Sequence, residues 1–227
     1  MDKNKVKEVI KDVSEISIQT ASSIIGGMVS EVLISQVLPG ATTIIFTAKQ
    51  KKTERMFKEA IKQINERIDE IDEKLEKLSQ RELNFVEDNV VLVMLCQIEK
   101  ELEEEKIKYF VNGMISAIEK PLTEEDIIIG FHDILSQLRM LDIRILVDAH
   151  KRTESSKAKE EKRGCDIENE YEALELYATR KLESLGLVTI HKTFNDLQGK
   201  EMVMTKDRLF ISTLGKRIIE FFGISVE

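Results

Sequence analysis

The side chains that most often carry out catalysis or bind metals are scattered along this chain. The three histidines, His132, His150 and His191, fall in different predicted elements, and none has a second histidine at a ligand spacing. A closed zinc site usually needs four nitrogen or sulfur ligands. Cys96 and Cys165 lie far apart in the sequence and form no metal-binding or redox motif. We therefore expect no metal and no cofactor, and we interpret both cysteines as buried or incidental thiols.

Carboxylates are concentrated at residues 99–105, just before Lys106 and Lys108. General acid–base or metal chemistry would need two carboxylates held together in a cleft. Nothing in the surrounding sequence excludes water, so the run is interpreted as a solvated helix face. The Gly-Gly pair at 26–27 lacks the pattern of a phosphate-binding loop, and no Gly-x-Ser-x-Gly nucleophile elbow is present. The sequence thus predicts a protein that is not an enzyme and has no catalytic residues.

Bulk composition narrows the class of partner. The chain has 227 residues, of which 33% are charged, and its net charge is −8, which predicts a well-solvated protein of one or two domains. The acidic balance argues against a protein that coats nucleic acid by charge alone. The first residues contain no compact apolar run with a cleavage site, so no signal peptide is expected. We expect a cytoplasmic protein, with peripheral attachment to the inner face of the membrane as the alternative.

Any functional surface is predicted to lie on helices, and the most regular pattern in the chain is an apolar heptad stripe. Its members follow one another at alternating steps of four and three residues, which predicts a long helix that packs against another helix. The packing partner is either the same chain, with residues 2–38 folding back, or a second copy. The stripe is the candidate self-association surface, and it consists of Phe57, Ile61, Ile64, Ile68, Ile71, Leu75 and Leu78.

An uncharged segment at residues 16–48 precedes this stripe. Glu31 is its one charged residue, 17 of its residues are apolar and nine are Ser or Thr. Pro39-Gly40 predicts a turn, so we expect a helical hairpin, which is either buried, oligomer-forming or associated with a membrane. Residues 16–38 are long enough to span a bilayer, whereas residues 41–48 are too short for a second pass. The small residues that would allow close helix packing or membrane contact are Ser22, Gly26, Gly27 and Ser30.

The composition predicts a mainly α protein in three parts. Residues 1–82 would form the helical hairpin and the heptad helix, or coiled coil, residues 83–150 a central helical bundle, and residues 151–227 a linker and a C-terminal module. Ten of the sixteen residues at 151–166 are charged, which is typical of an exposed helix extension or a linker. Within the bundle, apolar residues at helical spacing predict helices near 83–98, 107–118, 127–138 and 141–146.

The C-terminal module is predicted to resemble a winged helix. An amphipathic helix bearing Tyr171, Leu174 and Tyr177 should end at Gly186. A strand at 187–190, a polar turn and a returning strand at 209–211 would follow. Ser212 or Thr213 would then cap the final helix.

Winged helices often place such a helix in the DNA major groove. Here five glutamates between residues 168 and 183 would face phosphate, and residues 165–227 hold eight basic and eleven acidic residues. We therefore expect this module to bind a protein. The candidate DNA contacts are confined to the wing, at Lys192, Lys200, Lys206 and Arg208.

The combined pattern resembles bacterial Abi-alpha-type proteins, which are linked to abortive phage infection. The resemblance rests on the glycine-containing apolar hairpin at 24–52, on two segments of the helical middle, 106–110 and 141–146, and on 182–187 with 214–216 at the end. It covers much of the chain. It implies a non-enzymatic defence or regulatory role and offers no catalytic residues.

Three functions remain open at this point. The leading hypothesis is a non-enzymatic bacterial or phage-encoded interaction or regulatory protein that self-associates through its N-terminal helices, with a role in phage defence. The alternative is a dimeric winged-helix regulator that binds DNA. The third is a membrane-acting effector built on residues 16–48. The expected partners are a second copy of the chain and an unidentified protein.

Overall fold

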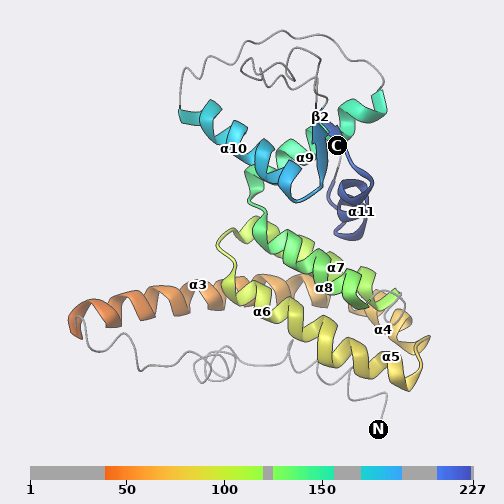
Figure 1. The fold of residues 1–227 in the computed structure, drawn as a ribbon. Helices are drawn as coiled ribbons and strands as arrows, with labels where there is room; N and C mark the ends of the chain where they lie inside the picture. The colour runs from red at the N-terminus through yellow and green to blue at the C-terminus, as the bar shows by residue number, and fades with distance from the viewer. Residues whose placement is uncertain (1–38, 120–124, 156–169, 191–208, 226–227) are drawn as a thin grey trace, which may run out of the picture. The chain divides into compact units, whose positions relative to one another are not determined.

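The described part of the chain forms two compact units (Figure 1). The first unit extends to His132 and the second begins at Asp133. Helices make up 83% of the described residues, so the prediction of a mainly α protein is confirmed. The computed structural model describes residues 39–119, 125–155, 170–190 and 209–225.

The first unit is a set of packed helices connected by short turns. Pro39 and Gly40 are the first described residues of a helix, so the prediction of a turn at these two residues is wrong. Ser79 caps a later helix by accepting a hydrogen bond from the Glu82 N–H, while the Glu82 carboxylate accepts one from the Ser79 N–H. The elements are α3 (Pro39–Glu66), α4 (Ile68–Glu76), α5 (Gln80–Phe85), the π-helical segment η1 (Val86–Val91), α6 (Leu92–Lys100), the 3₁₀ turn η2 (Glu104–Lys106) and α7 (Ile107–Glu119). The division between the two units falls within α8 (Glu125–Gln137).

The heptad stripe is divided between two helices rather than lying on one. Arg67 separates α3 from α4, with φ −120° and ψ 17°, outside the helical region. Its N–H donates to the Ile64 carbonyl and its carbonyl accepts from the Ile71 N–H. Both backbone polar groups of Arg67 are therefore hydrogen-bonded at the break between the helices. The prediction of a single long helix across the stripe is therefore wrong at Arg67.

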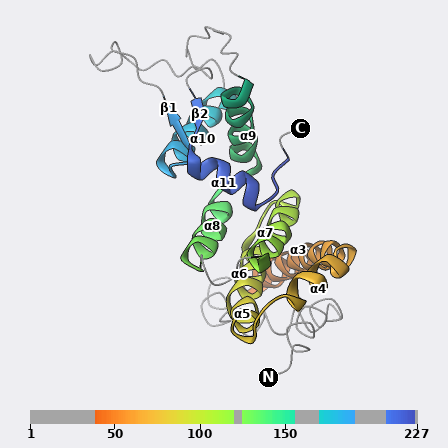
Figure 2. The same ribbon diagram turned by 90° about the vertical axis from the view of Figure 1, so that its right-hand side faces the viewer.

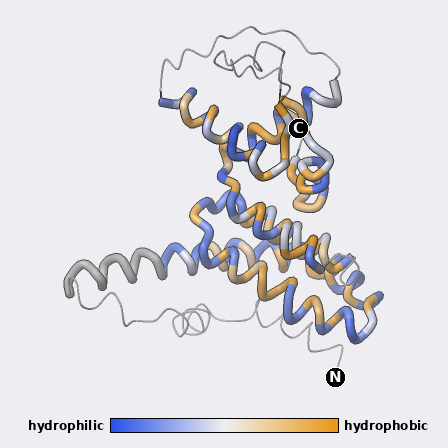
Figure 3. The backbone as a smooth tube through the Cα atoms, viewed as in Figure 1, coloured by the Kyte–Doolittle hydropathy of each residue, from blue (hydrophilic) through white to orange (hydrophobic). Residues whose placement is uncertain are grey.

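Most of the heptad stripe is buried within the first unit. Helix α3 contacts α6 and α7, and α4 contacts α7, and Figure 3 shows the apolar positions that recur along these helices. Ile61 and Ile68 are half-buried. The described packing thus supplies a partner for the stripe in the same chain, and self-association through it stays a prediction. The buried members are Phe57, Ile64, Ile71, Leu75 and Leu78.

The second unit combines three helices with a two-stranded antiparallel sheet (Figure 2). Its elements are α9 (Met140–Ser155), α10 (Glu170–Ser184), β1 (Val188–Ile190), β2 (Leu209–Ile211) and α11 (Thr213–Phe221). Val188 pairs with Ile211 and Ile190 with Leu209. Helix α9 contacts α10, β2 and α11, and the Thr153 hydroxyl accepts a hydrogen bond from the Ile211 N–H at 3.1 Å.

Two glycines end α10 and α11 in the same way. Gly186 has φ 71° and Gly223 has φ 54°, a left-handed conformation that side chains with a Cβ disfavour. After α10, the Leu187 N–H donates to the Leu182 carbonyl, and after α11 the Ile224 N–H donates to the carbonyl five residues earlier. The prediction that Gly186 ends the helix is confirmed.

Ser212 connects the end of α10 to the start of α11. Its hydroxyl donates to the Gly186 carbonyl at 2.6 Å and accepts from the Gly215 N–H at 2.9 Å. Its own N–H donates to the Leu187 carbonyl at 3.0 Å. Ser212, rather than Thr213, is thus the residue that caps α11.

The packing contacts divide the chain into domains at a different place from the boundaries predicted from composition. The heptad helices pack with residues 83–119 in one unit, and α9 packs with the C-terminal elements in the other. The contacts therefore divide the chain at 132/133, whereas charge and apolar content change at 82/83 and 150/151. Residues 1–38, most of the charged linker and the wing at 191–208 lie outside the described residues.

Gly215→Ala should strongly destabilise the second unit. A Cβ at Gly215 would lie 2.2 Å from the Leu187 carbonyl oxygen and 2.9 Å from the Ile211 side chain, so the backbone would have to move. We expect a loss of about 2 kcal/mol or more in the free energy of unfolding, measured by urea denaturation.

Gly130→Ala is the matched control. Gly130 lies within α8, and a Cβ there would meet nothing within 4 Å. Alanine should therefore leave stability unchanged or raise it by up to about 1 kcal/mol. Equal losses in the two variants would contradict the close approach of α11 to the chain after α10.

Candidate functional site

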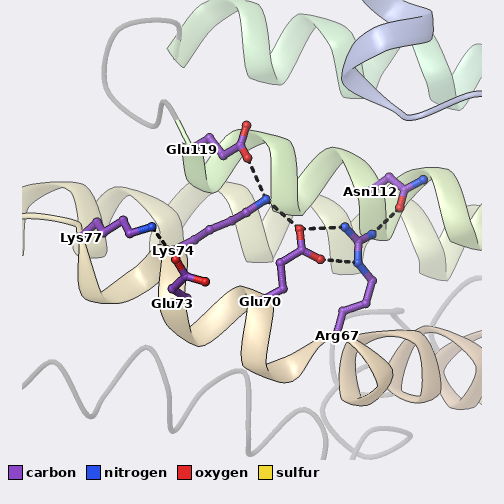
Figure 4. Close-up of polar contacts among 7 residues, drawn as sticks. All are labelled: Arg67, Glu70, Glu73, Lys74, Lys77, Asn112 and Glu119. Atoms are coloured by element: carbon purple, nitrogen blue, oxygen red, sulfur yellow. Dashed lines mark hydrogen bonds and ion pairs between the residues drawn. The ribbon is translucent and has the colours of Figure 1, made fainter.

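A network of charged side chains joins α4 to α7 (Figure 4). The Arg67 guanidinium donates to both Glu70 carboxylate oxygens, at 2.8 and 3.1 Å, and to the Asn112 side-chain oxygen at 2.6 Å. The Lys74 ammonium lies 2.8 Å from a carboxylate oxygen of Glu70 and 2.8 Å from one of Glu119. Opposite charges alternate along this network.

These pairings hold the network in its charged form. Hydrogen bonds from Arg67 and then Lys74 lower the pKa of Glu70 to about 2. Burial alone would lower the pKa of Lys74, but the hydrogen bonds to Glu119 and Glu70 outweigh it and raise that pKa. Each carboxylate is matched by a cation, so the network orients two helices and offers no group poised for proton transfer.

The acidic run at 99–105 contains a buried ion pair. The Lys106 side chain is 1% exposed and pairs with the Glu101 carboxylate, which is 8% exposed. The other Glu101 oxygen accepts the N–H groups of Leu102 at 2.6 Å and Glu103 at 2.9 Å. The Lys106 ammonium also lies 5.6 Å from the centre of the Phe110 ring. The prediction of a solvated helix face is therefore wrong for Glu101, which instead closes the turn between α6 and α7.

The remaining candidates for chemistry are dispersed in the structure. His132 is fully buried and stacks on Phe110, with ring centres 6.3 Å apart. His150 is half-buried in α9, and Cys96 is exposed on α6. Across the described ranges, no group of three or more His, Cys, Asp or Glu side chains could hold a metal ion. His191 and Cys165 lie outside those ranges.

The most unusual surface feature is on α10. Five large apolar side chains are exposed in the described part of the chain, and three of them lie on this helix. They are Tyr171, which is 57% exposed, Leu174 at 51% and Tyr177 at 67%. The sequence pattern placed these residues on the same amphipathic helix as Ala178 and Leu182, which are buried. The first two turns of α10 therefore expose the kind of side chains that dominate protein interfaces.

The charges on α10 are unevenly distributed along its axis. Glu170 and Glu172 are exposed in the first turn and Arg180 is exposed two turns later. Lys181 is engaged within the unit, because its ammonium lies 2.7 Å from the Asp142 carboxylate, which is buried. The exposed apolar side chains of α10 thus lie between an acidic end and a basic residue.

The other predicted contact residues fall into two groups. The heptad residues are brought together, but mostly inside the first unit. The small residues Ser22, Gly26, Gly27 and Ser30, and the wing residues Lys192, Lys200, Lys206 and Arg208, lie outside the described residues. Within the described ranges, none of the helices is both long and apolar enough to cross a membrane.

Comparison with known proteins adds no family to these observations. No protein-family model matches the chain, and neither the curated proteins nor the solved structures provide a significant match.

Acid should destabilise the first unit over a pH range that is set by the pKa of His132. Burial lowers the pKa of His132 from 6.5 to about 4, so the unfolded chain binds a proton that the folded chain excludes. Stability is full above pH 6.5 and is lost as the pH falls towards 4, by up to roughly 3 kcal/mol. Glu70 adds a smaller loss below pH 4.5 because its carboxylate is partly exposed.

His132→Phe should reduce the loss of stability between pH 6.5 and 4. Urea unfolding of the parent chain and the variant at several pH values gives the dependence of the free energy of unfolding on pH. A loss of packing that is independent of pH does not change this slope, so the two slopes can be compared directly. A variant that loses as much stability as the parent chain between pH 6.5 and 4 would show that another group carries the effect.

Lys106→Met should cost about 3 kcal/mol, because it leaves the Glu101 carboxylate buried without its cation. The double variant Lys106→Met/Glu101→Gln should recover part of this loss, since glutamine still accepts the two N–H groups. Lys77→Met is the matched control, because Lys77 also forms an ion pair, with Glu73 at 2.7 Å, but this pair is exposed, and the substitution should change stability little. Similar losses in Lys106→Met and Lys77→Met would contradict the role of burial.

Proposed function

We propose that this chain is a non-enzymatic interaction protein whose C-terminal module contacts another protein chain through the exposed face of α10. The observation that carries the proposal is the exposure of Tyr171, Leu174 and Tyr177 within two helical turns. Tyrosine supplies a large, rigid contact area at low entropic cost and is enriched at protein interfaces. A face of this kind gains free energy when a second surface covers it.

The order of elements in the second unit supports a winged-helix-like module. Helices α9 and α10 are followed by β1, the chain at 191–208, β2 and α11, so α10 occupies the position of a recognition helix. Its first turn carries Glu170 and Glu172, which would repel phosphate. The charge of α10 thus favours protein over DNA as its partner, and the DNA-binding alternative would depend on the wing.

The proposed contact surface on α10 is distinct from the heptad stripe. Phe57, Ile64 and Ile71 are buried against other helices of the first unit, so their apolar character is explained without a second copy. Self-association through the N-terminal helices remains a proposal, as does membrane contact through residues 16–48. A regulatory role in phage defence rests on the resemblance to Abi-alpha-type proteins alone.

A photo-crosslinking amino acid at position 177 tests the proposal in cells that express the full chain. We expect a protein adduct whose yield exceeds that from the same group at Arg217, an exposed position on α11. The mass of the adduct distinguishes a second copy of this 26.1 kDa chain from a different protein. Equal yields at the two positions, or adducts with nucleic acid, would overturn the assignment of α10.

A further inference from the structure

The solvent-facing side of α10 has a definite order of side chains. At 100° per residue, Glu170, Ala173, Leu174, Tyr177 and Arg180 project to one side of the helix, and all five are exposed. The buried side chains of Ala178 and Leu182 project about 120° further around the helix, towards the module core, and Leu174 lies at the border between the two sides. The exposed side therefore has an acid at one end, an apolar centre and a base at the other end.

This order of side chains is self-complementary when two copies of the helix lie antiparallel. If two copies of α10 lie antiparallel about a two-fold axis near residue 175, Glu170 of each copy lies beside Arg180 of the other. The same axis places Tyr177 over Ala173, where the small side chain leaves room for the ring, and brings the two Leu174 side chains together at the centre. A parallel pair would instead align like charges, which is unfavourable.

We propose that a second copy of this chain covers the exposed face of α10, in an antiparallel α10–α10 pair. This proposal rests on the proposed function, since it names the partner of that same surface. A two-fold contact uses the same patch twice, so every favourable pair in it occurs twice. Lys181 contributes little, because Asp142 of its own module already holds it.

The size of the contact sets the expected strength of the pair. Helix α10 has 15 residues, so it is about 22 Å long. One pair of such helices falls at the small end of specific interfaces, and exposed ion pairs at its edges add modestly. We therefore expect a dimer with micromolar affinity, whose formation depends on protein concentration and is weakened by salt.

Charge reversal tests the antiparallel arrangement in the full-length chain. Light scattering from about 1 µM to about 1 mM should show the mass rising from 26.1 kDa towards twice that value. Glu170→Arg and Arg180→Glu should each weaken the dimer about tenfold or more, and the double variant should restore it, because the exchanged charges pair again. Tyr177→Ala should weaken it too, whereas Arg217→Glu on α11 should not.

The outcomes separate this proposal from the proposed function. Circular dichroism of each variant checks that α10 stays folded, since both single reversals oppose the helix dipole. A chain that stays monomeric up to the highest concentration overturns self-pairing, as does a dimer that the double variant fails to restore. In either case an adduct between position 177 and a different protein would uphold α10 as a contact surface, and no adduct at all would overturn both.

Discussion

Burial of one apolar seam organises the first unit. The side chains of Phe57, Ile64, Ile71 and Leu75 enter the interior from α3 and α4, where α6 and α7 cover them. Each such side chain contributes on the order of 2 kcal/mol when it leaves water, so the seam outweighs any single ion pair in the unit. The network around Glu70 and the pair between Lys106 and Glu101 then fix which parts of the helices meet, because a shifted register would separate their charges.

The second unit depends on a different device, which is the close approach of two helix ends. With no side chain at Gly215, the first turn of α11 can lie against the Leu187 carbonyl, and Ser212 bonds to both segments. The short strands β1 and β2 extend from this point. Helix α10 is thereby fixed at its C-terminal end, while the apolar side chains of its first turns remain exposed. The proposed interaction surface would thus combine a rigid C-terminal base with an exposed N-terminal end.

Local patterns predicted the helices well, because apolar periodicity and caps act over a few residues. Gly186 ends α10 and Ser212 begins α11 as their types suggest. The sequence did not reveal the break at Arg67, since the apolar spacing continues through it, nor the burial of Glu101 in an acidic run, which depends on Lys106 folding back. The exposure of Tyr171 and Leu174 could not be predicted either, because they continue the buried stripe of Ala178 and Leu182. Whether a stripe is covered depends on distant elements that periodicity does not describe.

The π-helical segment η1 has a consequence for how this chain tolerates changes in length. Elements α5, η1 and α6 follow one another without a break from Gln80 to Lys100, and a π turn holds one more residue than an α turn. Deleting one residue within 86–91 would convert that turn to regular α-helix. Everything beyond it would keep its angular phase, so Met94 and Ile98 would still face inward. An insertion, in contrast, would rotate α6 by about 100° and turn those side chains towards water. The helix should thus tolerate the deletion of one residue in η1 but not an insertion.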